Sequence, residues 1–423
     1  MQLRRWRRGD RLAWASALAL RLAGTAAAQH PGIAPAGFLQ DPSGPVLVRG
    51  AYGLPQGMDA AGLRGLGFNV LHAGADEGEW TRARGAGLRV WHALGAAFDH
   101  RPELAGEREL ELRRAVERWG SRPELLFWES IDEPAWTDGR PEEPRFLPEP
   151  MTRAYAALRA TGDRHPVYLN HAPRNTVETL RRYSASCDIV CADIYPVIPR
   201  GLRPMYAITP DGRHGDHPDQ TIACVGRYVA KMREVARPGQ AVFVVLQGFA
   251  WEALRPTAEQ DPAQVQYPSY AESRFMAWDA LAHGATGIMY WGLHTVPGEH
   301  PFVRDLGRVL REIEELEPIL VGGRPLSQLP ALRYEERGAT VWDGLRLLGL
   351  AHGGAVWLVA INPSIDPATV TFSGLPPELA GAAEMEAWGE ARPRLPVAAG
   401  SFRDEFGPYA VHLYRAVRRE GAS

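Results

Sequence analysis

The sequence predicts an α/β protein in which a (β/α)8 TIM barrel is followed by a small C-terminal antiparallel β-sandwich domain. Between Pro45 and Val321, eight short apolar runs alternate with amphipathic stretches, which fits the strand and helix order of a barrel. From about Gly322 the runs are separated by Gly, Pro, Asn and Asp and lack helical periodicity, as in a sandwich. No glycine-rich phosphate-binding motif follows the first run, which counts against the alternative of an open doubly wound sheet.

Residues 1–28 are organised like a secretory signal peptide. Arginines precede the short apolar run Leu12–Leu20, and small residues at Ala26–Ala28 offer a cleavage site. We expect cleavage after Ala28 and a secreted or periplasmic protein, with a membrane-tethered or disordered N-terminus as the alternative. The apolar run is too short to span a bilayer, so stable membrane insertion is not expected. Residues 29–44, which are rich in proline and glycine, are expected to form a linker.

Composition restricts the partners. A net charge of -3 gives no reason to expect nucleic acid as a ligand. Cys187 and Cys191 lie four residues apart on an expected strand, about 13 Å between Cα atoms, which is too far for a disulfide. With Cys224 they are expected to be buried thiols, and no cofactor is indicated. The sequence carries no signal for an oligomeric state.

The barrel domain is expected over residues 45–321. Its expected strands are Pro45–Tyr52, Gly67–Ala73, Leu88–Leu94, Leu125–Ile131, Val167–Asn170, Asp188–Tyr195, Ala241–Gln247 and Thr286–Trp291. Its expected helices are Asp59–Leu66, Glu107–Trp119, Met151–Thr161, Thr176–Tyr183, Thr221–Val235, Ser269–His283 and Phe302–Leu316.

The β-sandwich is expected over residues 322–417, followed by a tail at 418–423. Its expected strands are Ala331–Tyr334, Ala339–Trp342, Leu345–Leu350, Ala355–Ile361, Ala368–Phe372, Ala383–Trp388 and Tyr409–Tyr414.

Polar and aromatic residues follow the barrel strands at their expected C-terminal ends, where (β/α)8 barrels carry their active sites. Glu133 is the first candidate for proton transfer, because an apolar surrounding and the neighbouring Asp132 both disfavour its ionised form. The alternative is that these carboxylates cap a helix. Glu129, four residues earlier, is expected to be a buried structural carboxylate paired with Arg89 or Arg49.

Further rim residues are candidates for substrate binding. His72, His92 and Asn170 could hydrogen-bond a substrate, and Trp251 and Trp291 could stack on the apolar face of a sugar ring. Core packing is the alternative for the two histidines and for Trp291. The spacing of the histidines resembles no metal-ligand motif, so no metal is expected.

At these residues the chain resembles the clan A glycoside hydrolases. That clan carries Asn-Glu-Pro at the end of strand four, with the Glu as acid/base, and Asp132-Glu133-Pro134 matches it with Asp in place of Asn. Trp291 matches a tryptophan at the end of strand eight, Tyr195 loosely matches a tyrosine near strand six, and a C-terminal β-sandwich is a common accessory. The resemblance covers about 46–414. It implies a hydrolase of an oligo- or polysaccharide with Glu133 as general acid/base.

One position departs from the clan. Its nucleophile is a Glu at the end of strand seven, where this chain has Gln247, and an amide cannot make the carboxylate attack. First, Asp193 or Glu252 could be the nucleophile, or the base for an inverting water. Second, the substrate's acetamido group could attack, oriented by Asp132 as in hexosaminidases, with Glu133 as acid. Third, the barrel could bind glycans without cleaving them. Fourth, a different strand-seven register could bring Glu252 to this place.

These alternatives differ in geometry. Direct catalysis needs a second carboxylate facing Glu133, at about 5 Å for retention or about 6.5–9.5 Å for inversion. A mouth with no such carboxylate within about 10 Å of Glu133, apart from the neighbouring Asp132, would leave the substrate-assisted and non-catalytic alternatives.

Overall fold

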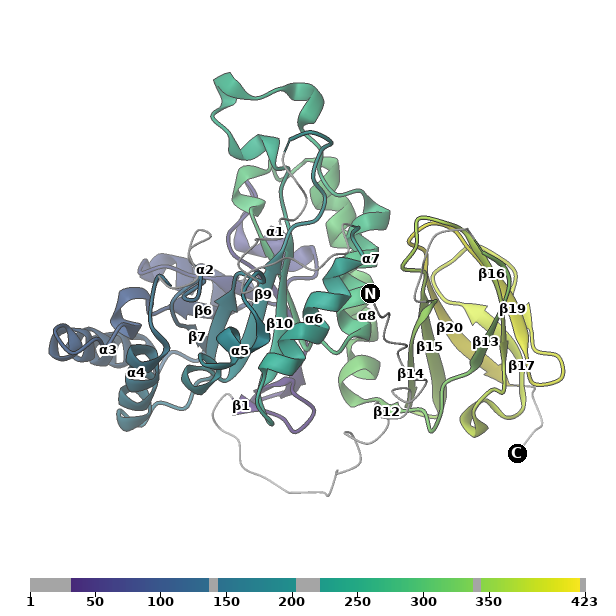
Figure 1. The fold of residues 1–423 in the computed structure, drawn as a ribbon, viewed down its shortest axis with the longest axis horizontal. Coiled ribbons are helices and arrows are strands. Elements are labelled where there is room, and N and C mark those ends of the chain that lie inside the picture. Colours follow the sequence, from purple (N-terminus) through teal and green to yellow (C-terminus); the bar gives the residue numbers. More distant parts are fainter. Residues whose placement is uncertain (1–31, 137–143, 203–220, 338–343, 419–423) are drawn as a thin grey trace, which may run out of the picture. The chain divides into compact units, whose positions relative to one another are not determined.

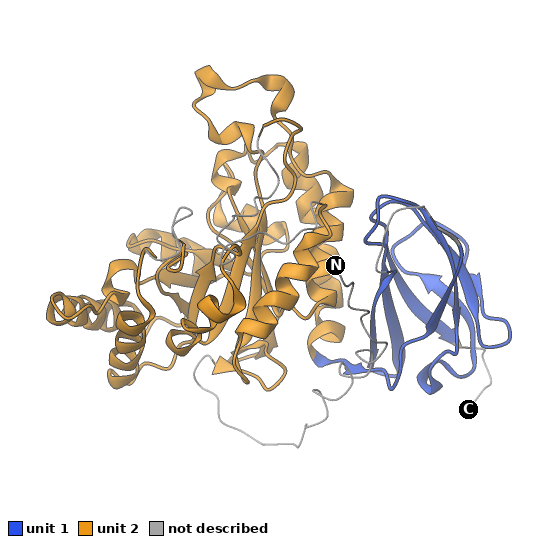
Figure 2. Cartoon of the chain, viewed as in Figure 1, with its two compact units in different colours: residues 1–27, 322–423 blue, residues 28–321 orange. Residues whose placement is uncertain are grey.

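The computed structural model describes residues 32–136, 144–202, 221–337 and 344–418 (Figure 1). One compact unit spans Ala28–Val321, and the second contains the chain from Gly322 onward (Figure 2). The units therefore divide where the sequence pattern changes. Within the described ranges, no helix combines the length and the apolar content needed to cross a membrane.

The first unit is a closed barrel of eight parallel strands, which confirms the predicted fold class. The strands are β4 (Val48–Ala51), β5 (Val70–His72), β6 (Arg89–Ala93), β7 (Leu125–Glu129), β8 (Val167–His171), β9 (Ile189–Ile194), β10 (Ala241–Gln247) and β11 (Gly287–Trp291). Each strand pairs with its sequence neighbours, and β11 closes on β4. The helices are α1 (Ala60–Gly65), α2 (Glu77–Gly85), α3 (Ala105–Trp119), α4 (Pro148–Ala160), α5 (Val177–Arg181), α6 (Cys224–Val235), α7 (Tyr270–Ala282) and α8 (Pro301–Gly322).

Alternate residues of the strands fill the barrel. Phe243 and Val245 of β10 belong to one buried cluster with Ile189 and Cys191 of β9 and with Trp91 of β6. Successive side chains of a strand point to opposite faces. Residues at the same parity further along these strands, among them Asp193 and Gln247, therefore continue the inward face toward the C-terminal mouth.

Helix α2 was not expected from the sequence. Asp76 caps its N-terminus by accepting a hydrogen bond from the Gly78 N–H, and only Trp80 and Ala83 are buried along its length. Two apolar side chains make too narrow a stripe to show a helical period.

The segment expected to be a linker contains a small antiparallel sheet of β1 (Gly32–Ile33), β2 (Leu39–Asp41) and β3 (Gly44–Val46). Leu39 is fully buried in the barrel's interior cluster, and Asp41 forms an ion pair with Arg89 of β6. This sheet therefore belongs to the barrel unit. Proline and glycine mark its turns, which is why the sequence reads as a linker.

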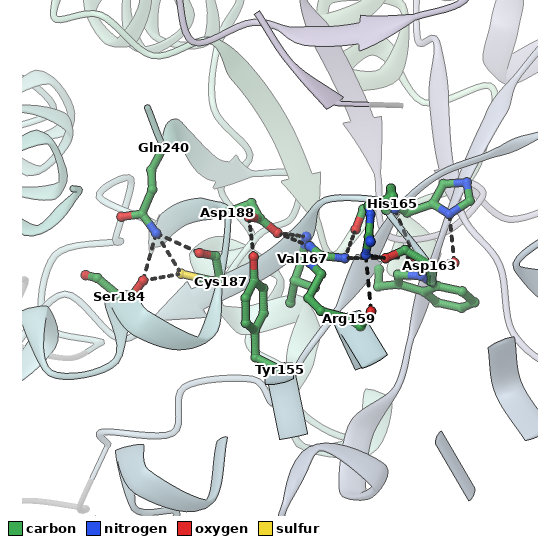
Figure 3. Close-up of polar contacts among 11 residues, drawn as sticks. Tyr155, Arg159, Asp163, His165, Val167, Ser184, Cys187, Asp188 and Gln240 are labelled. Atoms are coloured by element: carbon green, nitrogen blue, oxygen red, sulfur yellow. Dashed lines mark hydrogen bonds and ion pairs between the residues drawn. The ribbon is translucent and has the colours of Figure 1, made fainter. Parts of the chain in front are cut away.

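Polar contacts at the N-terminal ends of the strands tie the barrel to its helices (Figure 3). Asp188, just before β9, accepts hydrogen bonds from Tyr155 Oη at 2.7 Å and from the Val167 N–H at 2.8 Å, and it pairs with Arg159. Gln240, just before β10, donates to two backbone carbonyls of the turn before β9. These side chains have a structural role at the end opposite the candidate site.

The second unit consists of a six-stranded and a three-stranded antiparallel sheet, as a β-sandwich requires. Its strands are β12 (Arg324–Pro325), β13 (Ala331–Arg337), β14 (Arg346–His352), β15 (Ala355–Ile361), β16 (Ala368–Ser373), β17 (Ala382–Ala387), β18 (Leu395–Pro396), β19 (Phe402–Phe406) and β20 (Val411–Arg418). Strands β12, β18 and β19 were not expected, and the expected strand Ala339–Trp342 lies outside the described residues. Side chains from both sheets share one core, in which Phe372 stacks on Phe402 at 4.4 Å.

Candidate active site

Three carboxyl groups meet at the C-terminal mouth of the barrel. Asp132 and Glu133 follow β7, and Asp193 lies near the end of β9. Asn170 of β8 joins them, because its Nδ2 donates to Asp132 Oδ1 at 3.0 Å and to Asp193 Oδ1 at 3.3 Å. The carboxyl groups of Glu133 and Asp193 lie near enough for each to shift the other's pKa. We call Asp132, Glu133, Asn170 and Asp193 the acidic cluster.

The backbone holds Glu133 in an unusual conformation. Its φ of 45° lies in the left-handed region, which costs free energy for a residue with a Cβ atom. The Glu133 N–H donates to the Asn170 carbonyl at 3.0 Å, which fixes the turn against β8. Arg145 Nη1 donates to Glu133 Oε2 at 3.1 Å, so the carboxyl group is held from the side as well. Such strain is typical of residues whose direction matters for function.

Burial and mutual repulsion favour protonation of the acidic cluster. Burial, followed by the charge of Asp132, raises the pKa of Glu133, and Arg145 opposes this shift. Burial, with the charges of Glu133 and Asp132, raises the pKa of Asp193 well above its usual range. Asp132 is exposed to solvent, but it lies deep enough in the mouth that loss of surrounding water still raises its pKa. Glu133 and Asp193 therefore lose their protons as an interacting pair, because the charge of either one disfavours ionisation of the other.

Four aromatic side chains stand beside the acidic cluster. Tyr195 lies 5.9 Å from Trp291 with the rings inclined by 30°, and it meets Phe249 edge-on at 5.1 Å. Trp251 packs against Phe249 and donates its indole N–H to the Tyr195 carbonyl at 3.1 Å. Tyr195 and Trp291 are partly exposed, so their ring faces form a wall at the mouth. We call Tyr195, Phe249, Trp251 and Trp291 the aromatic wall.

Gln247 lies at the expected strand end, but backbone contacts occupy its amide. It is paired with Trp291 across β10 and β11, and its side chain is completely buried. Its Oε1 accepts from the Val197 N–H at 2.9 Å, and its Nε2 donates to the carbonyls of Val197 at 2.9 Å and Phe249 at 3.0 Å. The amide therefore fastens the segment after β9 to the end of β10.

Glu252 is buried in the loop after β10, with its contacts inside that loop. Its Oε1 accepts from Arg255 at 3.0 Å and from the Asp261 N–H at 2.7 Å. Because Gln247 itself ends β10 on the inward face, the register does not bring Glu252 to the strand-seven position.

The two histidines point to opposite sides of the barrel wall. His72 ends β5 on the inward face, where its ring lies 5.3 Å from Trp91. His92 points outward from β6, with its ring centroid 5.5 Å from that of Trp80 and 5.5 Å from that of Trp119. The structure therefore brings His72, but not His92, into the barrel mouth. Strand parity separates the two residues, although both lie near strand ends.

The partners of Glu129 differ from the expected arginines. Arg49 pairs with Glu314 and Glu317, and Arg89 pairs with Asp41. Glu129 instead accepts a hydrogen bond from Trp91 Nε1 at 2.8 Å, and its Oε2 lies 4.0 Å from His72 Nε2. The expectation of an arginine partner was wrong because the side chains of both arginines reach groups outside the barrel interior.

Sequence reasoning also missed Arg145 at the mouth and Tyr168 in the barrel interior. Tyr168 lies inside an apolar run that reads as core, and Arg145 is thirteen positions from Asp132 along the chain, in a segment with no periodic pattern. Among the residues that the structure describes, no group of three or more His, Cys, Asp or Glu side chains is arranged to hold a metal ion.

Comparison with known proteins finds solved structures with a similar fold. No family model matches the chain, and no curated protein matches it in sequence. Among solved structures, a glycoside hydrolase family 5 protein from Bacteroides vulgatus is 13% identical, with a TM-score of 0.58 over 93% of each chain. A β-galactosidase from Bacillus circulans sp. alkalophilus is 10% identical, with a TM-score of 0.55 over 89% of this chain and 100% of its own. An Anoxybacillus α-amylase is 9% identical, with a TM-score of 0.54 over 88% of this chain and 98% of its own. The chain thus shares its overall fold with these glycoside hydrolases.

Proposed function

We propose that this chain is an exported glycoside hydrolase that cleaves an oligo- or polysaccharide, with Glu133 as general acid/base and Asp193 as nucleophile. The observation that carries the proposal is that Asn170 joins Asp193 to Asp132, the neighbour of Glu133, at the barrel mouth, where Glu133 and Asp193 shift each other's pKa. Asp193 supplies the second carboxylate that direct hydrolysis needs and that Gln247 does not provide. The basic and apolar pattern of residues 1–28 supports export.

The closeness of the two carboxyl groups supports a retaining reaction. Inverting enzymes separate their carboxyl groups by about 6.5–9.5 Å to admit a water molecule, whereas retaining enzymes hold theirs at about 5–5.5 Å. We assign the shorter separation to Glu133 and Asp193, because each shifts the other's pKa.

The roles follow from the neighbours of each group. The proposed roles require the proton to lie on Glu133 when the sugar is bound. Asp132 beside Glu133 favours the protonated glutamic acid; burial raises the pKa of Asp193 as well, and the Asn170 amide that donates to Asp193 favours the ionised aspartate. Glu133 gives its proton to the glycosidic oxygen as that oxygen leaves C1, and an Asp193 oxygen forms a bond to C1. Glu133 then takes a proton from a water whose oxygen attacks C1, and the C1–Asp193 bond breaks. Both carboxyl groups return to their starting states.

The aromatic wall supports a sugar as the substrate. Sugar rings present apolar C–H faces, and the partly exposed rings of Tyr195 and Trp291 offer flat surfaces beside the acidic cluster. Asn170 Oδ1 is buried and has no hydrogen-bond partner among the described residues, so it can accept from a sugar hydroxyl. Asp132, which is accessible beside Glu133, can accept from another.

The test compares wild type with Glu133→Gln on a broad panel of glycans. We expect the wild type to cleave at least one glycan and the variant to lose at least about a hundredfold in kcat, since general acid catalysis contributes about 10²–10⁴. Glu259→Gln is the matched control, because Glu259 is exposed in the loop after β10 and lies outside the acidic cluster.

Equal cleavage by wild type and Glu133→Gln would refute the assignment of Glu133. Calorimetric binding of a glycan without turnover would favour a carbohydrate-binding barrel, the alternative that Gln247 raises. Cleavage confined to N-acetylated sugars and unaffected by Asp193→Asn would favour substrate assistance, with Asp132 orienting the acetamido group.

A further inference from the structure

A second polar group lies inside the barrel next to the acidic cluster. Glu129, the last residue of β7, is 6% exposed and precedes Glu133 by four positions. Its Oε2 accepts from Trp91 Nε1 at 2.8 Å and lies 4.0 Å from His72 Nε2. Tyr52 is hydrogen-bonded to Tyr168 Oη at 2.8 Å, and the side chains of Tyr52 and Glu129 lie near enough for each to shift the other's pKa. We call Tyr52, His72, Trp91, Glu129 and Tyr168 the floor cluster.

Glu129 and His72 are both uncharged where their side chains approach each other. Burial is the main cause that raises the pKa of Glu129 to about 8, and the charge of Asp132 adds to it. Burial also lowers the pKa of His72 to about 4, helped by the neighbouring His92. Between these values the 4.0 Å contact joins a carboxylic acid and a neutral imidazole. Burial is what decides this outcome, because an ion pair at this depth loses more hydration than it regains at 4.0 Å.

The groups around Glu129 come from six neighbouring parts of the barrel. The titratable side chains that interact with it or share its surroundings are Tyr52 after β4, His72 of β5, Asp132 after β7, Tyr168 of β8 and Cys191 of β9. The sixth part is β6, which contributes the Trp91 N–H. Asp132 connects Glu129 to the acidic cluster, since each charge affects the other's ionisation.

We propose that Glu129 is a positioning residue that works as an uncharged carboxylic acid, and that with His72 and Tyr52 it forms the neutral floor of the sugar site. Its acid proton is donated within the floor cluster, and its carbonyl oxygen accepts from Trp91. His72 and Tyr52, which are partly exposed, present this floor to the ligand. Ionisation of Glu129 would place another negative charge beside Asp132 and would tighten the hold of Glu133 and Asp193 on their protons. The inference deepens the proposed function and rests on it.

Two substitutions separate this role from a merely structural one. Glu129→Gln keeps the acid's shape, its acceptor for Trp91 and a donor for the floor cluster, but it cannot ionise. We expect kcat/KM at pH 6 within about threefold of wild type. Glu129→Leu removes donor and acceptor and leaves buried partners unsatisfied, so we expect a loss of about 10- to 100-fold. If Glu129 acted through its negative charge, the two variants would be equally impaired.

The pH profile gives the second readout. Above about pH 8 the wild type should lose activity through ionisation of Glu129 as well as through the acidic cluster, and Glu129→Gln should lose only the latter. The alkaline limb of kcat/KM should therefore be less steep in the variant. An identical limb in both proteins would overturn the proposal.

An infrared difference spectrum between wild type and Glu129→Gln at pH 6 tests the protonation without any turnover. A carboxylic acid C=O band that is present in the wild type and lost in the variant is the expected result, and a carboxylate band in its place would overturn the proposal. The infrared readout does not depend on turnover, so it holds even if the barrel does not cleave glycans. Should Glu129→Leu not fold, Tyr52→Phe takes its place, because it removes only the hydroxyl that bonds Tyr168 and lies near Glu129 in the floor cluster. We expect about a tenfold loss of kcat/KM in Tyr52→Phe, and no change would count against the proposal.

Discussion

Replacing Gln247 with glutamate would give the barrel the strand-seven carboxylate of the clan A glycoside hydrolases that its sequence resembles, and we expect the variant to be less stable and no more active. The wild-type amide donates to the carbonyls of Val197 and Phe249 and accepts from the Val197 N–H, with no exposed surface. A carboxylate keeps the accepted bond only. It leaves two buried carbonyls without a donor and places a negative charge against both oxygens.

The expected cost follows from these contacts. Each buried acceptor that loses its donor costs about 1–3 kcal/mol, so the free energy of unfolding should fall by about 2–6 kcal/mol. Protonation of the introduced carboxylate would restore one of the two donated bonds. The pKa of this new carboxyl group should therefore lie above that of a free glutamate, and the stability deficit should grow as the pH rises from about 5 to about 8.

Urea unfolding of wild type and Gln247→Glu at pH 5 and pH 8, with kcat/KM measured alongside, checks this expectation. Gln240→Glu is the matched control, because Gln240 also donates to two backbone carbonyls, at the opposite end of the barrel (Figure 3). Gln240→Glu should also be less stable than wild type, but its folded fraction should keep wild-type kcat/KM. A Gln247→Glu variant that is as stable as wild type and turns over faster would refute the view that this amide stabilises the backbone by joining the segment after β9 to the end of β10.

Three further outcomes follow from the contacts of individual side chains. Arg145→Ala should raise the pKa of Glu133, since Arg145 holds it down, and should move the alkaline limb of kcat/KM to higher pH; an unmoved limb would contradict Glu133 as the acid. Trp291→Ala should weaken glycan binding by about tenfold in calorimetry, from the loss of one stacking surface, and an unchanged Kd would mean that the ring packs only against protein. Asp404→Asn should destabilise the sandwich by about 2–4 kcal/mol in urea unfolding at pH 7, because Arg392 loses its 2.7 Å carboxylate partner. Arg392 and Tyr414 lower the pKa of Asp404, so this stabilisation is present above the pKa of an unfolded aspartate and is lost at lower pH. If wild type and Asp404→Asn differed equally in free energy of unfolding at pH 7 and at pH 3, the reasoning would be contradicted.

The barrel was predictable because its strands are buried on both faces. Runs such as Ala241–Gln247 stay apolar until the strand ends, and the polar residue at that end then marks the mouth. Period-two alternation within the same runs also determines which side chains face inward. Applied to β6, it places His92 outward among Trp80 and Trp119.

The partners of the site residues were not predictable, because they lie far apart in sequence. Gln247 and Val197 are 50 positions apart, and nothing local to either one indicates that the amide and the peptide group meet. The contact of Asp193 with Glu133 depends in the same way on the turn that gives Glu133 its positive φ. Sequence periodicity locates a residue on a strand and a face, but it does not determine hydrogen bonds between loops.

The role of Asp193 as the group that attacks the sugar is the part of the proposed mechanism that an experiment can test most directly. A fluorinated glycoside with a good leaving group, matched to whichever glycan the wild type cleaves, should accumulate as a covalent glycosyl-enzyme. Peptide mass spectrometry of the trapped protein should place the adduct on Asp193, and Asp193→Asn should carry none. An adduct on Glu252, or cleavage with inversion and no adduct, would contradict the pairing of Glu133 with Asp193 as acid and nucleophile.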